Sequence, residues 1–203
     1  FFGAAAAMIP NSDITIKNIL ANPTRIGFFS ILEKMGAGFE YNNMRKECGE
    51  WVGDIHIYSQ PLNGIDITKE IVPTIIDELP ILALMATQAH GITKVSGAEE
   101  LRVKESDRIE AICDNLKNMG ADVEELDDGF IIKGPTKLNG ALIKTYDDHR
   151  IAMTFEIASL IAEGKTQLDN NSCISISFPE FLSLPNTRPE LCLVFNISIA
   201  SSN

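Results

Sequence analysis

The chain has 203 residues, of which 45% are hydrophobic and 22% charged, a composition typical of a globular protein rather than a disordered one. Its formal net charge of −11 at pH 7 argues against a surface built to neutralise nucleic-acid phosphates. The apolar run that opens the chain is about half the ~20 residues that a membrane span requires. We therefore expect neither nucleic acid nor a membrane as a partner.

Four cysteines are spread through the sequence without a CxxC pair and without a metal-ligand spacing to the three histidines: Cys48, Cys113, Cys173 and Cys192. Cys113 falls on an apolar helical stripe and is expected in the core. Unpaired cysteines of this kind are typical of a reducing compartment. We predict a reduced, cytoplasmic protein.

The predicted elements begin with a helix in FFGAAAAMIP, which does not start with Met and has no basic leader. We interpret it as the middle of a helix and expect sequence to precede it. A strand follows in DITI (13–16). An alanine-rich apolar segment also precedes GITKV (91–95) and GKTQL (164–168). The matching threonines, Thr15, Thr93 and Thr166, are 78 and 73 residues apart. Each copy predicts a buried helix, a turn and a strand.

A second repeat relates ILEKMGAGFEY (31–41) to NLKNMGADVEEL (115–126), at an offset of 84 residues. The shared pattern predicts a helix that ends at Gly36 or Gly120, because glycine adopts the left-handed conformation common after a helix. An edge strand is expected after each glycine. Further along the second copy, the pattern predicts a hairpin of residues 123–126 and 130–134 across Asp127, Asp128 and Gly129.

These repeats predict an α/β (α+β) lobe of about three similar units, since self-similarity at a roughly constant period indicates repeated supersecondary structure. We assign residues 1–182 to one domain, because no linker or low-complexity tract interrupts them. Residues 183–203 break the pattern. They are interpreted as an extra strand or as a read-through or frame-altered end.

The stretch LRVKESDRI (101–109) has two interpretations. Asp107 followed by Glu110 resembles a capping box, which would leave the neighbouring charges solvated. Alternatively, Lys104 and Arg108 stand at a helix N-terminus, where free backbone N–H groups favour an anion. Cations at that end of a helix oppose the helix dipole, which suggests that they bind an anionic ligand.

A second charged stretch, YDDHRIAM (146–153), opens another apolar helix, expected over residues 151–162. Asp147 or Asp148 would cap that helix, with His149 on the surface. On the functional interpretation, Arg108 and Arg150 together hold a phosphate or carboxylate through bidentate hydrogen bonds.

Asp77 precedes the buried helix expected over residues 79–89. Such an acid is most often an N-cap, and Glu78 competes for that role. A carboxylate at this position is also suited to act as a general base.

Six motifs in order resemble 5-enolpyruvylshikimate-3-phosphate synthase over residues 1 to about 182: NPTRIG, LEKMGA, the acid before LALMA, VKESDRI, DHRIAM and SFPEF. The resemblance implies a lobe of repeated βαβαββ units with pseudo-threefold symmetry, helices buried and sheets outside. It implies a second lobe, absent from this sequence, and an active site between the lobes. The family is usually monomeric.

The resemblance also implies a reaction and roles for residues. The enolpyruvyl group of phosphoenolpyruvate moves to the 5-hydroxyl of shikimate 3-phosphate, with no metal or organic cofactor. Asp77 would take the hydroxyl proton, Glu105 would protonate the methylene carbon, and Lys104 would assist either transfer. Arg108 and Arg150 would hold phosphoenolpyruvate, supported by His149. We expect the chain alone to be inactive.

Two positions depart from the family. Ile176 stands where many members have a lysine, and Glu100 stands where some have an asparagine that contacts substrate. Three alternatives remain open. The first is the sister enzyme that uses UDP-N-acetylglucosamine, the second a non-catalytic phosphoenolpyruvate-binding lobe, and the third, more remote, a phosphate-cyclase-like enzyme.

Overall fold

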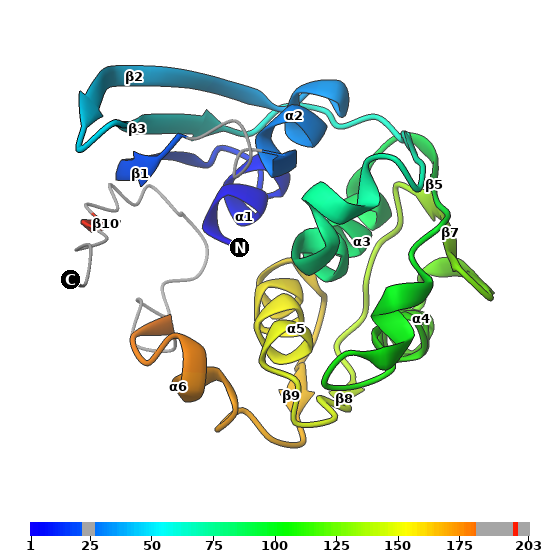
Figure 1. The fold of residues 1–203 in the computed structure, drawn as a ribbon. Coiled ribbons are helices and arrows are strands. Elements are labelled where there is room, and N and C mark those ends of the chain that lie inside the picture. Colours follow the sequence, from blue (N-terminus) through cyan, green and yellow to red (C-terminus); the bar gives the residue numbers. More distant parts are fainter. Residues whose placement is uncertain (22–26, 182–196, 199–203) are drawn as a thin grey trace.

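The fold is described from a computed structural model for residues 1–21, 27–181 and 197–198. Three helices lie side by side in the interior: α1 (Phe2–Met8), α3 (Leu79–Gln88) and α5 (His149–Ile161). Three sheets lie around these helices (Figure 1). The prediction of an α/β lobe with its helices buried and its sheets outside is confirmed.

The sheets repeat one arrangement. A strand that follows a buried helix pairs in parallel with a two-residue strand, as β1 does with β10, β5 with β4 and β9 with β8. The first two sheets add an antiparallel hairpin, giving the orders β10-β1-β3-β2 and β4-β5-β7-β6. The strands are β1 (Asp13–Leu20), β2 (Gly38–Glu47), β3 (Glu50–Tyr58), β4 (Asp66–Ile67), β5 (Gly91–Val95), β6 (Asp122–Leu126), β7 (Gly129–Gly134), β8 (Leu142–Ile143), β9 (Gln167–Leu168) and β10 (Ile197–Ser198).

Two outer helices join these sheets to the interior, and both end as predicted. After α2 (Gly27–Lys34) and α4 (Arg108–Asn118), Gly36 and Gly120 have φ angles of 84° and 88°. In each case the amides of the glycine and of the alanine after it bond back to carbonyls of the last turn, which is the Schellman arrangement that glycine permits. The strands that follow, β2 and β6, lie at sheet edges. Short helices complete the described chain: η1 (Val72–Thr74), η2 (Ile76–Glu78), η3 (Glu99–Val103) and α6 (Ile174–Ser177).

The core follows from the sequence pattern of the helices. Helix α3 is apolar on all sides and is buried along its length from Leu79 to Thr87. Helix α4 is amphipathic and buries one stripe that includes Ile109, Ile112 and Cys113, as the spacing predicted. The predicted hairpin is also present, with Leu126 paired to Gly129 across a two-residue turn.

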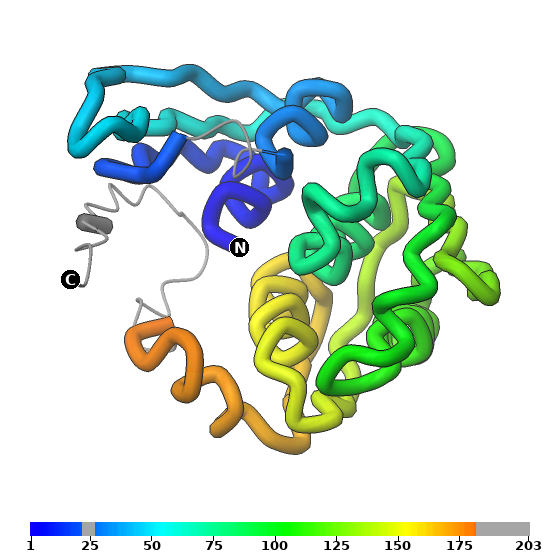
Figure 2. The backbone as a smooth tube through the Cα atoms, in the orientation of Figure 1, coloured from blue at the N-terminus to red at the C-terminus, as the bar shows by residue number. Residues whose placement is uncertain are grey.

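The chain passes from the first sheet through the second to the third around the interior helices (Figure 2). In the tail, Ile197 and Ser198 form the extra strand β10; the remaining predictions for residues 183–203, and the NPTR motif at residues 22–25, lie outside the described residues. Within the described ranges, no helix is long and apolar enough to cross a membrane.

Candidate active site

Two helix starts carry the charged motifs, and both are capped by aspartate. Asp107 Oδ1 accepts a 3.0 Å hydrogen bond from the amide of Glu110 at the start of α4. Asp148 Oδ1 accepts hydrogen bonds from the amides of Arg150, at 2.9 Å, and Ile151, at 3.4 Å, at the start of α5. The capping interpretation therefore holds at both motifs, and of the two candidates in the second motif Asp148 is the cap.

Asp148 also binds a side chain of the other helix. Arg108 Nε donates to Asp148 Oδ2 over 2.8 Å, and the hydroxyl of Ser106 donates to the same oxygen over 3.1 Å. The side chains of Arg108 and Asp148 are 1% and 0% exposed. A charged pair buried to this degree is stable only with several hydrogen bonds on both partners, and this pair has them.

The pKa of Asp148 reflects a balance of burial and bonding. Burial alone raises the pKa of a carboxyl group, because it disfavours the charged form. Here the hydrogen bond and charge of Arg108, with the bonds from the Arg150 amide and the Ser106 hydroxyl, outweigh burial and lower the pKa. Asp148 is therefore a buried carboxylate that stays ionised.

Asp77 bridges the two arginines. It lies in η2, immediately before α3, and its carboxylate accepts from Arg108 Nη1 at 3.3 Å and from Arg150 Nη2 at 3.1 Å. Arg150 Nη1 also donates to the backbone carbonyl of Asp77 over 3.0 Å. Neither Asp77 nor Glu78 caps α3 through a side-chain hydrogen bond. The three predicted residues Asp77, Arg108 and Arg150 thus meet at one place.

Glu105 and Lys104 point to different partners. Glu105 Oε2 accepts a 2.6 Å hydrogen bond from Arg108 Nη2. The ammonium of Lys104 donates to Glu100, the position where some relatives have asparagine. Glu105 therefore belongs to the arginine cluster, whereas Lys104 bonds Glu100 outside it, and no hydrogen bond between Lys104 and Glu105 is seen in the described chain.

The two remaining sequence-derived positions lie in α5 and α6. His149 is the first residue of α5, half-buried and adjacent to Arg150. Ile176, in α6, has a side chain that is 85% exposed. Isoleucine supplies no charge for an anion, so the position where many relatives have a lysine adds none here.

The guanidinium of Arg108 has three carboxylate partners: Asp77, Glu105 and Asp148. They differ in exposure, since the side chains of Asp77 and Glu105 are 45% and 53% exposed whereas that of Asp148 is not exposed. An incoming anion can replace the two exposed carboxylates at the arginines, because water can solvate them once they are released. The two exposed carboxylates therefore occupy guanidinium donors that a bound anion would need.

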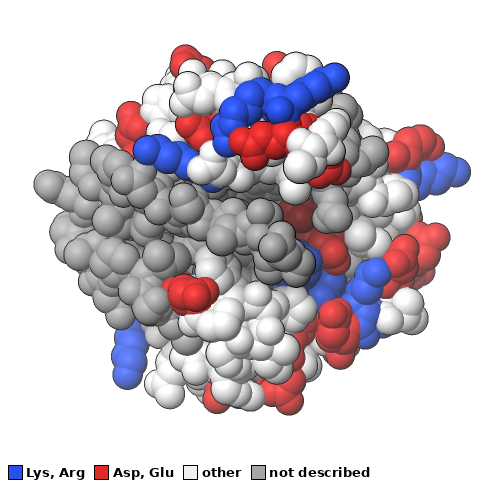
Figure 3. All heavy atoms as spheres, turned by 60° about the vertical axis from the view of Figure 1, so that its left-hand side comes forward, with Lys and Arg blue, Asp and Glu red and all other residues white. Residues whose placement is uncertain are grey.

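The charges on one face of the molecule are mixed rather than uniformly basic. On the face shown in Figure 3, acidic and basic side chains lie among one another, without a continuous basic surface. The cluster itself is mixed as well, with Arg108 and Arg150 beside three carboxylates, those of Asp77, Glu105 and Asp148. This agrees with the acidic balance of the whole chain.

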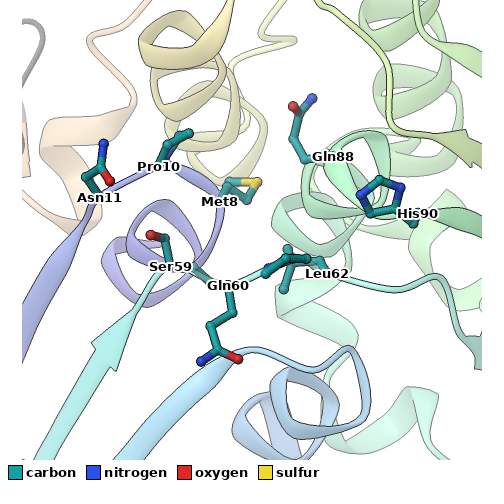
Figure 4. A pocket seen from close by; sticks show the side chains of 10 residues that line it. Met8, Pro10, Asn11, Ser59, Gln60, Leu62, Gln88 and His90 are labelled. Atoms are coloured by element: carbon teal, nitrogen blue, oxygen red, sulfur yellow. The ribbon is translucent and has the colours of Figure 1, made fainter.

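A cavity of about 430 Å³ lies elsewhere, beside the C-terminal ends of α1 and α3 (Figure 4). Met8, Gln88 and His90 are among its lining residues, and none of the charged cluster is. Asp77 precedes the ten-residue helix α3 whereas Gln88 ends it, so the two places are about 15 Å apart at 1.5 Å per residue. The cavity is therefore separate from the candidate site.

Sequence reasoning missed two members of the cluster as functional candidates. The sequence indicates Asp148 only as a cap and does not indicate Ser106. Both belong to the motifs that carry the arginines, so position within KESDR and DDHR was the available signal. Their contact joins residues 42 apart in the chain, which spacing on a single helix does not reveal.

Comparison with known proteins gives a consistent result. Residues 1–184 match the family model described as EPSP synthase (3-phosphoshikimate 1-carboxyvinyltransferase). The chain is 52% identical to the 3-phosphoshikimate 1-carboxyvinyltransferase of Persephonella marina over 182 residues, 89% of this chain and 42% of the relative. It is 50% identical to that of Endomicrobium trichonymphae over 188 residues, 92% of this chain and 44% of the relative.

Solved structures agree with the sequence comparison. EPSP synthase from Acinetobacter baumannii is similar with a TM-score of 0.86 and 40% identity, over 90% of this chain and 43% of that chain. The enolpyruvyl transferase NikO from Streptomyces tendae shares the fold, with a TM-score of 0.65 at 16% identity over 90% of this chain and 40% of that one. The chain spans less than half the length of these relatives.

Proposed function

Because this chain belongs to the EPSP synthase family, we propose that it forms one lobe of an enzyme that transfers the enolpyruvyl group of phosphoenolpyruvate to the 5-hydroxyl of shikimate 3-phosphate. The observation that carries the proposal is the bridge that Asp77 makes between Arg108 and Arg150. This reaction needs a general base close to side chains that bind the anionic groups of phosphoenolpyruvate, and the bridge brings such residues within hydrogen-bonding distance.

The chemistry requires a proton to arrive and a proton to leave. The substrate hydroxyl attacks carbon 2 of phosphoenolpyruvate and loses its proton, while carbon 3 gains one, giving a tetrahedral adduct. Elimination then removes a proton from carbon 3, breaks the bond between carbon 2 and the phosphate oxygen, and releases phosphate. An acid and a base on opposite sides of the reacting carbons support both steps.

The arginines are suited to hold phosphoenolpyruvate. Arg108 and Arg150 present planar guanidinium groups, which bind phosphate and carboxylate through paired hydrogen bonds. In the free protein those donors bind Asp77 and Glu105. When phosphoenolpyruvate takes their place, both carboxylates are released beside the reacting atoms, where charge that develops on the adduct is stabilised by the arginines.

The released carboxylates then take the catalytic roles. We assign Asp77 as the base that accepts the proton of the substrate hydroxyl, and Glu105 as the acid that protonates the methylene carbon. Lys104 leaves Glu100 to donate a hydrogen bond to the substrate hydroxyl. His149, at the start of the same helix as Arg150, supports the position of that arginine.

The complete enzyme needs a second lobe, which we expect to close on this one around both substrates. Such closure excludes water and completes the catalytic residues, so the chain alone is expected to have no turnover. We expect the complete protein to be a cytoplasmic monomer of two lobes, with residues 1–182 as one lobe and residues 183–203 as an atypical tail. No metal or organic cofactor is needed for the steps above.

A chimera tests the proposal. Residues 1–182 replace the matching segment of the Persephonella marina relative, and phosphate release is measured with phosphoenolpyruvate and shikimate 3-phosphate. Turnover with this acceptor, and none with UDP-N-acetylglucosamine, is the expected result. Turnover with UDP-N-acetylglucosamine instead would favour the sister reaction. A folded chimera that binds phosphoenolpyruvate without turning it over would indicate a binding lobe.

A further inference from the structure

We propose that Asp148 is a positioning residue, whose carboxylate fixes the direction in which Arg108 presents its guanidinium group to a substrate anion. The inference rests on the proposed function in taking that anion to be phosphoenolpyruvate. It gives Asp148, in the second charged stretch, a role in addition to capping α5.

The first support is geometric. Asp148 binds the Nε edge of Arg108, with Nε–H donating over 2.8 Å to Oδ2 and Nη2–H donating over 3.4 Å to Oδ1. The Nη atoms then face Asp77 and Glu105. Because a guanidinium group is planar and rigid, holding one edge determines where the other edge points.

The second support is the contrast in burial among the three carboxylates around Arg108. Asp148 has no exposed side-chain surface, whereas Asp77 and Glu105 are about half exposed. Loss of one partner from a buried pair leaves the other charge without solvation, so a buried pair does not exchange partners readily. Asp148 is therefore the permanent partner, and Asp77 and Glu105 are the exchangeable ones.

The third support is that the Asp148 carboxylate accepts hydrogen bonds from both arginine residues. Its Oδ1 accepts from the backbone amide of Arg150, and its Oδ2 accepts from the side chains of Arg108 and Ser106. A shift of Asp148 therefore moves the start of α5 and the Arg108 guanidinium together. This coupling ties the Arg108 guanidinium group to the backbone at the start of α5, from which the Arg150 side chain extends.

Substitution of Asp148 by serine distinguishes the proposed positioning of Arg108 from a role limited to capping α5. Serine is as good an N-cap as aspartate, so Asp148→Ser retains the cap of α5 but removes the carboxylate from Arg108. Asp148→Asn removes the charge at nearly constant shape. The matched control is Asp147→Asn, since Asp147 is the exposed neighbour and bonds only Asn170 among the described residues.

The test is NMR of the 203-residue chain labelled with nitrogen-15, in which the Arg108 Nε–H signal is assigned by its loss in Arg108→Lys. We expect a slowly exchanging signal in the wild type and in Asp147→Asn. In Asp148→Ser and Asp148→Asn the exchange becomes about 10- to 100-fold faster, as expected for loss of a hydrogen bond between charged groups. In Asp148→Ser the Ile151 amide remains protected.

Three results would overturn the proposal: no protected Arg108 signal in the wild type, an unchanged signal in Asp148→Ser, or unfolding of both Asp148 variants, which would assign the residue to folding alone. Titration with phosphoenolpyruvate then tests the substrate separately. If the Arg108 signal depends on Asp148 but phosphoenolpyruvate leaves the Arg108 and Arg150 signals unmoved, the assigned substrate fails while the positioning of Arg108 stands.

Discussion

Arg108 and Asp148 are forty residues apart in the sequence and form a buried pair in which Nε–H donates to the carboxylate over 2.8 Å. The pair joins the first residue of α4 to the N-cap of α5. It therefore links the stability of the lobe to the geometry of the candidate active site. A change in the ionisation of Asp148 should affect both.

Acid should destabilise the chain through this pair. The pKa of Asp148 is lowered in the folded state, below the value of about 4 of an unfolded chain. Its contribution to the free energy of unfolding is therefore complete above about pH 4 and is lost as the pH falls through the folded-state pKa. Urea unfolding between pH 2 and 6 should show a shallower loss of stability for Asp148→Asn than for the wild type. Parallel pH curves would contradict this account.

Replacement of Asp77 by asparagine should separate binding from turnover. The substitution removes the charge that bridges Arg108 and Arg150, so phosphoenolpyruvate no longer competes with a carboxylate and should bind as tightly as in the wild type or more tightly. Turnover in the chimera should fall about 100-fold or more, as for loss of a general base. Isothermal titration and phosphate release measure the two effects.

The matched control for this substitution is Asp114→Asn, because Asp114 is exposed on α4. It should change neither binding nor turnover. A loss of phosphoenolpyruvate binding in Asp77→Asn alone would show that Asp77 contributes to binding and does not merely fill the anion site.

The buried interior of α3 should account for a large part of the stability. Leu84 is fully buried in that helix, so Leu84→Ala should lower the free energy of unfolding by about 2–5 kcal/mol. Leu160→Ala on α5 is the control, since Leu160 is 36% exposed and should cost less than about 1 kcal/mol. Equal losses in urea unfolding would mean that α3 is not the packed centre of the lobe.

The cysteines should differ sharply in reactivity. Burial raises the pKa of Cys113 to about 12 and also raises the pKa of Cys173, whereas Cys48 is exposed. Because the thiolate is the reactive form, iodoacetamide should modify Cys48 in the native protein and leave Cys113 and Cys173 intact. Mass spectrometry of tryptic peptides measures this, and early labelling of Cys113 would contradict the packing of α4.

Local sequence signals predicted much of this fold because their causes are local. Gly36 and Gly120 adopt the left-handed conformation that ends a helix, and Asp107 caps α4 within three residues. The repeated spacing of helix and strand predicted three units. These features depend on neighbours along the chain, so they can be read without knowledge of the tertiary structure.

Features that depend on distant partners were not predictable in the same way. Asn18 and Asn43 adopt left-handed conformations at bulges in β1 and β2, and both bond to Asp54. Nothing local to either asparagine identifies that carboxylate. In the site, the motifs indicated that Arg108 and Arg150 act together. They did not indicate that the Asp77 carboxylate bonds both arginines, or that Asp148 bonds the Nε edge of Arg108.

If this lobe contributes an acid and an anion site to enolpyruvyl transfer, Glu105→Gln in the chimera should remove most of the turnover and leave phosphoenolpyruvate binding. Glutamine removes the proton-donating carboxyl at constant size, with Glu99→Gln as the control because Glu99 is exposed. We expect turnover in Glu105→Gln to fall about 100-fold or more, phosphoenolpyruvate affinity to change by less than about tenfold, and Glu99→Gln to be indistinguishable from the parent chimera. Full turnover in Glu105→Gln would contradict it.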